Sequence, residues 1–376
     1  MSGPHIALSV PELFLGILEH LSTGELEAAA LVCKAWLAPA VDTKWRTQSV
    51  KLSRLLSNLA PIERSQFKNR GALFVLAPKT PITHDHWHRF LEQYANRITR
   101  LVFDMQLDEA SIGLISALLE RFGGHFGYNL ISLGWSYGTH NGDCTGTLIN
   151  LLPGTRLQEV DFCSEEQFYL TGTSSLNPLS QLSHRAPHIS KLENVFNSFD
   201  FSVFPQLRYL SHCGFLSTSD YHNLLYSQDL TVLFLRWTKG QVTPFHGTNA
   251  TFLHLERLGF HSPDDEAEEM VIRSVMPALR FLKYVKHGVI GPFTLTLLNN
   301  ILRTSPLLGK ISIVAVVPSQ LELVEHHGVR SLSFNGSYHL RSPLETADVD
   351  LLAVSRFFPT LGKLAALQWN GNERRV

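Results

Sequence analysis

One serine in the middle of the chain has the spacing of a catalytic nucleophile. Residues 134–138 read GWSYG, which matches the Gly-x-Ser-x-Gly elbow and follows an expected strand. The elbow needs a helix directly after the serine, but the residues that follow, GTHNGDCTG, are mostly turn formers. No HGGG-type segment precedes the motif to stabilise an oxyanion. A serine hydrolase built on Ser136 is therefore a minor alternative, which an ester-cleavage assay of Ser136→Ala would test.

Histidines and acids also occur in short runs that could hold a metal ion. Neighbouring side chains of HDHWH (residues 84–88) would point apart on a helix, and no further ligand is evident. The run DDEAEE (264–269) follows Ser262 and Pro263 in the order of a helix start, which predicts a solvated helix face. The glycines of GGHFG (123–127) follow an expected helix and indicate a C-cap loop. We therefore expect no catalytic residue, no metal, no cofactor and no enzymatic activity.

The composition is that of a large globular chain. It has 376 residues, of which 44% are hydrophobic and 17% charged, which favours at least two structural units. The formal net charge of −1 gives no basic excess for a nucleic acid or an anionic membrane surface, so neither is an expected partner. The four cysteines form no CxxC pair, and no apolar run is long enough to span a bilayer. We expect reduced thiols and a cytoplasmic or nuclear location.

The N-terminal segment VPELFLGILEHLSTGELEAAALVCKAW is rich in apolar residues at helical spacing. Ser9 with Glu12, and Ser22 with Glu25, have the spacing of capping boxes. They predict one helix from about Pro11 to His20 and a second from Glu25 to Leu37, which Pro39 would end. Helices this short cannot hide so many apolar side chains in one small core. An exposed apolar patch of roughly 300–600 Å² would mark an interaction site, so the segment is expected to be a docking module.

The same residues, taken in order, resemble the F-box. That pattern begins with Leu-Pro, an acid and an aliphatic residue, and it closes with Val-Cys-(Lys/Arg)-x-Trp and Leu-Trp-Arg. This chain has Val10-Pro11-Glu12-Leu13, Ile17-Leu18, Leu21, Glu25-Leu26, Val32-Cys33-Lys34-Ala35-Trp36 and Trp45-Arg46. The match covers about the first fifty residues, and it departs from the pattern at Val10, Leu18, Glu25 and Lys44.

The resemblance implies a partner. F-box modules bind a Skp-type adaptor, which links them to the cullin and RING subunits of SCF ubiquitin ligases. The residues that would face the adaptor are Val10, Pro11, Leu13, Ile17, Leu18, Leu21, Leu26, Val32, Cys33 and Trp36. The alternative is that these residues only form the core of a helical cap on the domain behind.

From Ile98 onward one template recurs, Leu-x-x-Leu-x-apolar. Copies begin at residues 98, 130, 157, 207, 230, 255, 279, 308, 329 and 361, with a poorer copy at Leu192-Val195. Between Leu210 and Leu282 the central residues are 23 to 25 apart. Helical patterns at Leu107–Phe122, Ser219–Tyr226 and Pro292–Arg303 separate some of the copies. Strand and helix alternating at this period predict a leucine-rich-repeat solenoid, with parallel strands and helical crossovers.

The expected fold is therefore α/β, a three-helix F-box followed by an irregular leucine-rich-repeat solenoid. We expect the F-box in residues 1–50, a linker and N-terminal cap of the solenoid in 51–97, and the solenoid in 98–376. In the linker, GALFVLAP is a candidate first strand and ITHDHWHRFLEQYANR a candidate helix.

Together the two halves resemble F-box proteins that carry leucine-rich repeats. The resemblance implies a substrate-recognition subunit of an SCF-type ubiquitin ligase, which holds the adaptor with its helices and a target protein with its repeats. Residues between the buried positions of a strand point to the open face, where a target would bind. The candidates for target binding are Phe234, Arg236, Arg257, His261 and Lys283. The alternative is a protein-binding scaffold with no ligase role.

Overall fold

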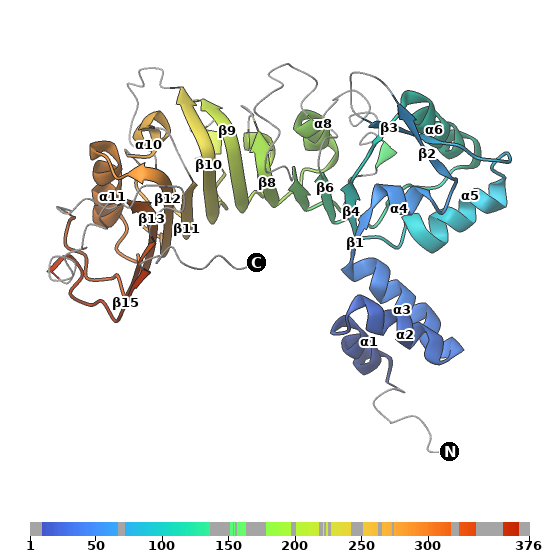
Figure 1. Cartoon of the computed structure of the whole chain (residues 1–376), viewed down its shortest axis with the longest axis horizontal. Coiled ribbons are helices and arrows are strands. Elements are labelled where there is room, and N and C mark those ends of the chain that lie inside the picture. Colours follow the sequence, from blue (N-terminus) through green and yellow to red (C-terminus); the bar gives the residue numbers. More distant parts are fainter. Residues whose placement is uncertain are drawn as a thin grey trace, which may run out of the picture. The chain divides into compact units, whose positions relative to one another are not determined.

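The computed structural model of the chain is shown in Figure 1. It describes residues 10–66, 72–135, 151–152, 154, 156–162, 178–196, 201–217, 221, 223–224, 227–241, 251–261, 265–272, 274–316, 323–335 and 356–367. The chain divides into two compact units, Met1–Ile189 (unit 1) and Ser190–Val376 (unit 2). The boundaries expected after residues 50 and 97 stay predictions.

Unit 1 begins with three helices, α1 (Pro11–Glu19), α2 (Thr23–Val32) and α3 (Lys34–Thr47). Helix α1 starts with Pro11 in its first turn, where a missing N–H costs no hydrogen bond. The Ser9 cap that we expected lies outside the described residues. At α2 the Glu25 carboxylate accepts hydrogen bonds from the backbone N–H and the hydroxyl of Ser22, at 2.7 and 2.6 Å. These bonds lower the pKa of Glu25 and confirm the expected capping box, although α2 begins at Thr23 and not at Glu25.

The expected end of the second helix at Leu37 was wrong. Helix α2 ends at Val32, because Cys33 has an extended backbone with φ −161° and ψ 164°. A separate helix, α3, begins at Lys34 and continues through Pro39. Pro39 is the sixth residue of α3, so the backbone donor that it removes is lost near the helix start. Burial of Ala40 and Thr43 on the following turn favours a helix there in spite of this loss.

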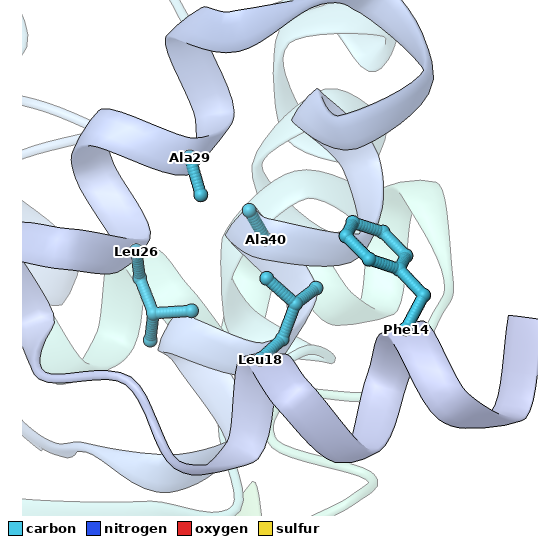
Figure 2. Packing of buried hydrophobic residues seen from close by; sticks show 5 residues of the cluster. All are labelled: Phe14, Leu18, Leu26, Ala29 and Ala40. Atoms are coloured by element: carbon cyan, nitrogen blue, oxygen red, sulfur yellow. The ribbon is translucent and has the colours of Figure 1, made fainter. Parts of the chain in front are cut away.

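The three helices share one small core, which Figure 2 shows. Its buried side chains point toward one another from all three helices: Phe14, Leu18, Leu26, Ala29 and Ala40. The Trp36 ring packs against this core, with its centroid 4.9 Å from that of Phe14. Small side chains between the large ones let the helices approach closely. This core contains only a few of the apolar residues of the three helices.

Helix α3 is tied to the segment that follows the helices. Arg97 donates a hydrogen bond to the Asp42 carboxylate at 2.6 Å, and the Thr99 hydroxyl donates one to the backbone carbonyl of Arg46 at 2.5 Å. Trp45 meets Tyr94 edge to face, with ring centroids 5.6 Å apart. These contacts hold the carboxyl-terminal half of α3 against residues 94–99.

The segment after α3 contains a small separate sheet. Its elements are α4 (Leu52–Leu56), β2 (Ile62–Gln66), β3 (Ala72–Leu76), α5 (His84–Phe90), the π-helix η2 (Leu91–Ala95) and β5 (Gln106–Leu107). Strand β3 pairs with β2 antiparallel and with β5 parallel. The expected strand in GALFVLAP therefore exists, but the prediction that it is the first strand of the solenoid was wrong. That place belongs to β1 (Ser49–Lys51), which pairs with β4.

The rest of unit 1 is a parallel sheet in the order β1-β4-β6-β7. Its later strands are β4 (Arg100–Phe103), β6 (Ser132–Trp135) and β7 (Glu159–Asp161). Helix α6 (Glu109–Phe122) lies between β4 and β6 in the chain, and α8 (Pro178–Arg185) follows β7. The Asp108 carboxylate caps α6 by accepting a bond from the Ser111 N–H at 2.9 Å.

In the described part of unit 2, eight strands form a parallel sheet in the order β8 to β15. The strands are β8 (Lys191–Phe196), β9 (Tyr209–Ser217), β10 (Val232–Gln241), β11 (Arg257–His261), β12 (Phe281–Val289), β13 (Lys310–Val316), β14 (Ser331–Asn335) and β15 (Lys363–Leu367). Its helical segments are η3 (Phe201–Val203), α10 (Asp265–Ile272) and α11 (Pro292–Thr304). Parallel strands joined through such segments need crossovers, as the repeat pattern predicts.

The repeat template is confirmed by the strand register. In the poorer copy, Leu192 was expected as the first residue, but it pairs with Leu210 and so holds the central place. The central residues of successive copies lie side by side, in the order Leu192, Leu210, Leu233, Leu258, Leu282, Ile311, Leu332 and Leu364. Those from Leu192 to Leu332 are almost fully buried. In unit 1 the same register joins Leu101, Leu133 and Val160. The fold is thus mixed α/β with a long parallel sheet of the leucine-rich-repeat type.

Candidate docking surfaces

The N-terminal helices keep many apolar side chains outside their core. Leu13 is 54% exposed and Leu31 85% exposed, although both are large and apolar. The complete set, which we call the helical apolar set, is Val10, Leu13, Leu15, Ile17, Leu31, Val32 and Leu37. Single exposed leucines are common on proteins, but seven exposed apolar residues on three short helices are a concentration typical of interaction sites.

Most of the residues expected to face an adaptor are accessible. Val10, Pro11, Leu13, Ile17, Val32 and Cys33 are exposed, and Leu21 and Trp36 are half-buried. Leu18 and Leu26 are each only 1% exposed, so expecting them at a contact surface was wrong. They point inward because each lies on the helix face that completes the shared core with Phe14. The buried core and the exposed apolar residues of the helices are therefore made by different residues, and adaptor binding by the exposed ones stays a prediction.

A second surface lies on the open side of the sheet in unit 2. Residues that alternate with the buried leucines share rows across the strands: Tyr209, Val232, Arg257, Phe281 and Lys310 are in register in one row. Ser211, Phe234, Gly259, Lys283 and Ser312 are in register in the next row. We call this surface the strand face. Four of the five predicted target-binding residues, Phe234, Arg236, Arg257 and Lys283, present half-buried or exposed side chains there, and His261 is the half-buried partner of Arg236 in the third row.

The aromatic rings of the strand face are held against each other and against cations. The Tyr209 and Phe234 ring centroids are 5.9 Å apart. The Arg257 guanidinium and the Lys310 ammonium lie 5.3 and 5.4 Å from the centroid of the Phe281 ring. A cation over an aromatic face is attracted by the ring quadrupole and keeps its full charge. Tyr209, Phe281, Lys191 and Lys310 had no distinct signal in the sequence, because only the register brings them beside the predicted residues.

Phe234 owes its position to a glycine on the next strand. A Cβ atom added to Gly259 would lie 2.0 Å from Phe234 Cδ1, so the ring occupies the space of a side chain on β11. Glycine in a strand often marks such a close approach. The strand face therefore includes an apolar platform whose shape depends on residue 259.

One carboxylate lies among these cations. Glu193 pairs with Lys191 at 3.3 Å. Burial, and then the charge of Glu193 and a hydrogen bond to it, raise the pKa of Tyr209 to about 12, so the phenol stays protonated at neutral pH. Glu193 thus interacts with Lys191 and Tyr209, at the β8–β9 end of the strand face.

The candidate catalytic serine stays a prediction, and the candidate metal ligands that the structure describes form no cluster. Ser136 lies outside the described residues. In the histidine run, the His84 side chain is exposed. The Nε2 atom of His88 lies at hydrogen-bond distance, 3.1 Å, from the carbonyl oxygen of Phe122. No group of three metal-ligating side chains is present among the described residues. None of the helices in this described part of the chain could cross a membrane.

The acidic run at 264–269 was predicted as a solvated face, and Glu268 corrects that prediction. Its side chain is fully buried and accepts hydrogen bonds from the Tyr284 hydroxyl at 2.5 Å, the Thr294 hydroxyl at 2.8 Å and the Lys286 ammonium at 2.8 Å. Four side chains from α10, β12 and α11 therefore meet at one buried carboxylate. A buried charge is tolerated when it is paired and hydrogen-bonded in this way. We therefore assign the cluster a structural role, in holding α10 and α11 on β12.

Comparison with known proteins adds no family. No protein-family model matches the chain, and no curated protein matches it. Among solved structures, the chain is similar to an internalin (inlF) from Listeria monocytogenes at 12% identity. The similarity covers 74% of this chain and 77% of that one, with a TM-score of 0.28. At that score the match carries no weight here, and the fold rests on the strand register described above.

Proposed function

We propose that this protein is a substrate-recognition subunit of an SCF-type ubiquitin ligase. In this proposal the helical apolar set binds a Skp-type adaptor, and through it the cullin and RING subunits, in the cytoplasm or nucleus. The repeat sheet would hold the target protein. The chain itself would carry out no chemistry, because ligation needs only that a target lysine be held near the conjugating enzyme.

The observation that carries the proposal is the division of apolar residues on α1. Phe14 and Leu18 face the core, while Leu13 and Ile17, one turn apart, face outward. A helix that only capped the sheet would need one apolar face, and α1 has two. Full burial of one leucine contributes about 1.5–3 kcal/mol, so a partner that covered Leu13 and Ile17 would gain enough for measurable affinity.

The test is adaptor binding by the full chain with Leu13→Asp. We expect at least thirtyfold weaker binding to a purified Skp-type adaptor in calorimetry, since a charge replaces a buried leucine at the contact, at a cost of about 2 kcal/mol or more. The matched control is Leu307→Asp in unit 2, because Leu307 is also 54% exposed and apolar. The control should bind like the wild type.

Equal binding by Leu13→Asp and wild type, with both folded, would contradict the docking assignment. Trp36→Ala is a poor test, because Trp36 packs on the core and its loss would disturb the helices. If no adaptor bound the wild type at all, the second candidate would be favoured, a protein-binding scaffold that uses its repeats alone.

A further inference from the structure

The strand face of unit 2 carries a one-sided charge. Among the side chains that the structure describes, five cations project from it, Lys191, Arg236, Arg257, Lys283 and Lys310, against one carboxylate, that of Glu193. The whole chain has a net charge of −1, so this surface is not a reflection of a basic protein. Such a local excess attracts groups of the opposite charge.

Within the part of the chain that the structure describes, no carboxylate pairs with the strand-face cations on β11 to β13. Among the described residues, Arg257, Lys283 and Lys310 form no ion pair with a carboxylate. Arg257 and Lys310 instead flank the Phe281 ring, which fixes their position and leaves their charge uncompensated. Arg236 lies at the same surface, with its guanidinium 3.4 Å from the amide oxygen of Asn194.

Aromatic rings lie between these charges. Tyr209, Phe234 and Phe281 are each half-buried, so part of every ring stays accessible. Phe234 lies against Gly259, and its ring is tilted by 48° beside the Tyr209 ring, so both neighbours limit where it can move. Pre-positioned rings and cations reduce the entropy lost when a partner binds.

We infer that the strand face binds a segment of a partner protein that is rich in Asp and Glu and has aliphatic residues between them. The carboxylates would pair with Arg236, Arg257, Lys283 and Lys310, and the aliphatic side chains would lie on the rings between them. This names the chemical class of the target and therefore rests on the proposed function.

The size of the surface sets the length of the segment. Neighbouring strands are ~4.8 Å apart, so the five steps from Lys191 on β8 to Lys310 on β13 span about 24 Å. An extended chain rises ~3.3 Å per residue, so about seven residues cross the strand face. A probe of eight residues is therefore long enough to reach every cation.

The experiment measures fluorescence anisotropy of a labelled peptide, Glu-Leu-Asp-Glu-Leu-Glu-Asp-Leu, with the full chain. We compare the wild type with Arg257→Gln/Lys310→Gln. Each exposed pair contributes up to about a fivefold change in affinity, so we expect about tenfold weaker binding by the double variant. Raising the salt from about 50 to 500 mM should also weaken binding by the wild type.

A matched control removes the same number of cations elsewhere in unit 2. Arg303→Gln/Arg356→Gln changes two exposed arginines that lie outside the strands, and it should bind the peptide like the wild type. The double variant of the strand face should keep its adaptor binding, which separates failure of this inference from failure of the proposed function.

Three results would overturn the inference. One is equal binding of the acidic peptide by the wild type and Arg257→Gln/Lys310→Gln. Another is equal affinity of the wild type for a peptide with Gln and Asn in place of Glu and Asp. The third is tighter binding of a twelve-nucleotide single-stranded RNA than of the peptide, which would assign the surface to nucleic acid.

Discussion

At the scale of single residues, Gly259 shows how one missing side chain shapes a surface. Phe234 lies over it, with Cδ1 only 2.0 Å from where a Cβ would be. Backbone freedom is not the reason for glycine here, since residue 259 lies within a regular strand. The reason is space, and that space positions an aromatic ring at the centre of the strand face.

Gly259→Ala should destabilise unit 2 because the new methyl group must displace the Phe234 ring. Overpacking of this kind costs about 1–3 kcal/mol. The measurement is hydrogen exchange of peptides covering β10 and β11, which should exchange faster in the variant. Gly259→Ala made in a Phe234→Ala background is the control, since the ring is then absent. An equal effect in both backgrounds would show that the ring contact is not the cause.

At the scale of elements, the buried Glu268 joins two helices to a strand. Helix α10 contributes the carboxylate, β12 contributes Tyr284 and Lys286, and α11 contributes Thr294. Tyr284 is one of the inward residues of the repeat template, and it carries its hydroxyl to the helical side of the sheet. The cluster therefore fixes how α10 and α11 lie on the sheet of unit 2.

Glu268→Ala should loosen α10 and α11, because it removes the carboxylate that pairs with Lys286 and accepts hydrogen bonds from two hydroxyl groups. Removing one partner of a buried ion pair costs about 3–5 kcal/mol. We expect a lower thermal unfolding midpoint and faster hydrogen exchange in both helices. Glu269→Ala, which changes the half-buried neighbour on the same helix, is the control and should have little effect. Equal exchange in the two variants would contradict the structural role of Glu268.

At the scale of the whole molecule, the two candidate surfaces belong to different units. The helical apolar set lies in unit 1, and the strand face lies in unit 2. Mutational effects at separate sites without shared partners usually add. The proposed function needs this independence, because a recognition subunit must hold the adaptor and the target at the same time.

Leu13→Asp should therefore keep wild-type affinity for the acidic peptide while it loses adaptor binding. The two measurements are made on one preparation of the full chain, by anisotropy and by calorimetry. Parallel loss of both activities would indicate unfolding of the whole chain rather than damage to one surface. Circular dichroism of the same sample distinguishes these outcomes.

The sequence by itself determined the repeat architecture and the presence of short N-terminal helices. Each copy of Leu-x-x-Leu-x-apolar buries the same positions, and the structure places the central residues in one continuous register. The capping box at Ser22 and Glu25 was also readable, because its residues are three apart and interact locally. Periodicity and caps are short-range signals, so they survive without knowledge of the fold.

Only the tertiary structure decided which residues are available for binding. Leu18 and Leu26 fit the docking pattern as well as Leu13 does, but packing among three helices buries them. The strand face depends on register across strands about 25 residues apart in the chain, so Tyr209, Phe281 and Lys310 could not be assigned to it beforehand. The sequence predicts Glu268 as a solvated acid, but packing of α10 against β12 buries it beside Tyr284. Contacts between distant segments are set by the fold as a whole, and no local pattern encodes them.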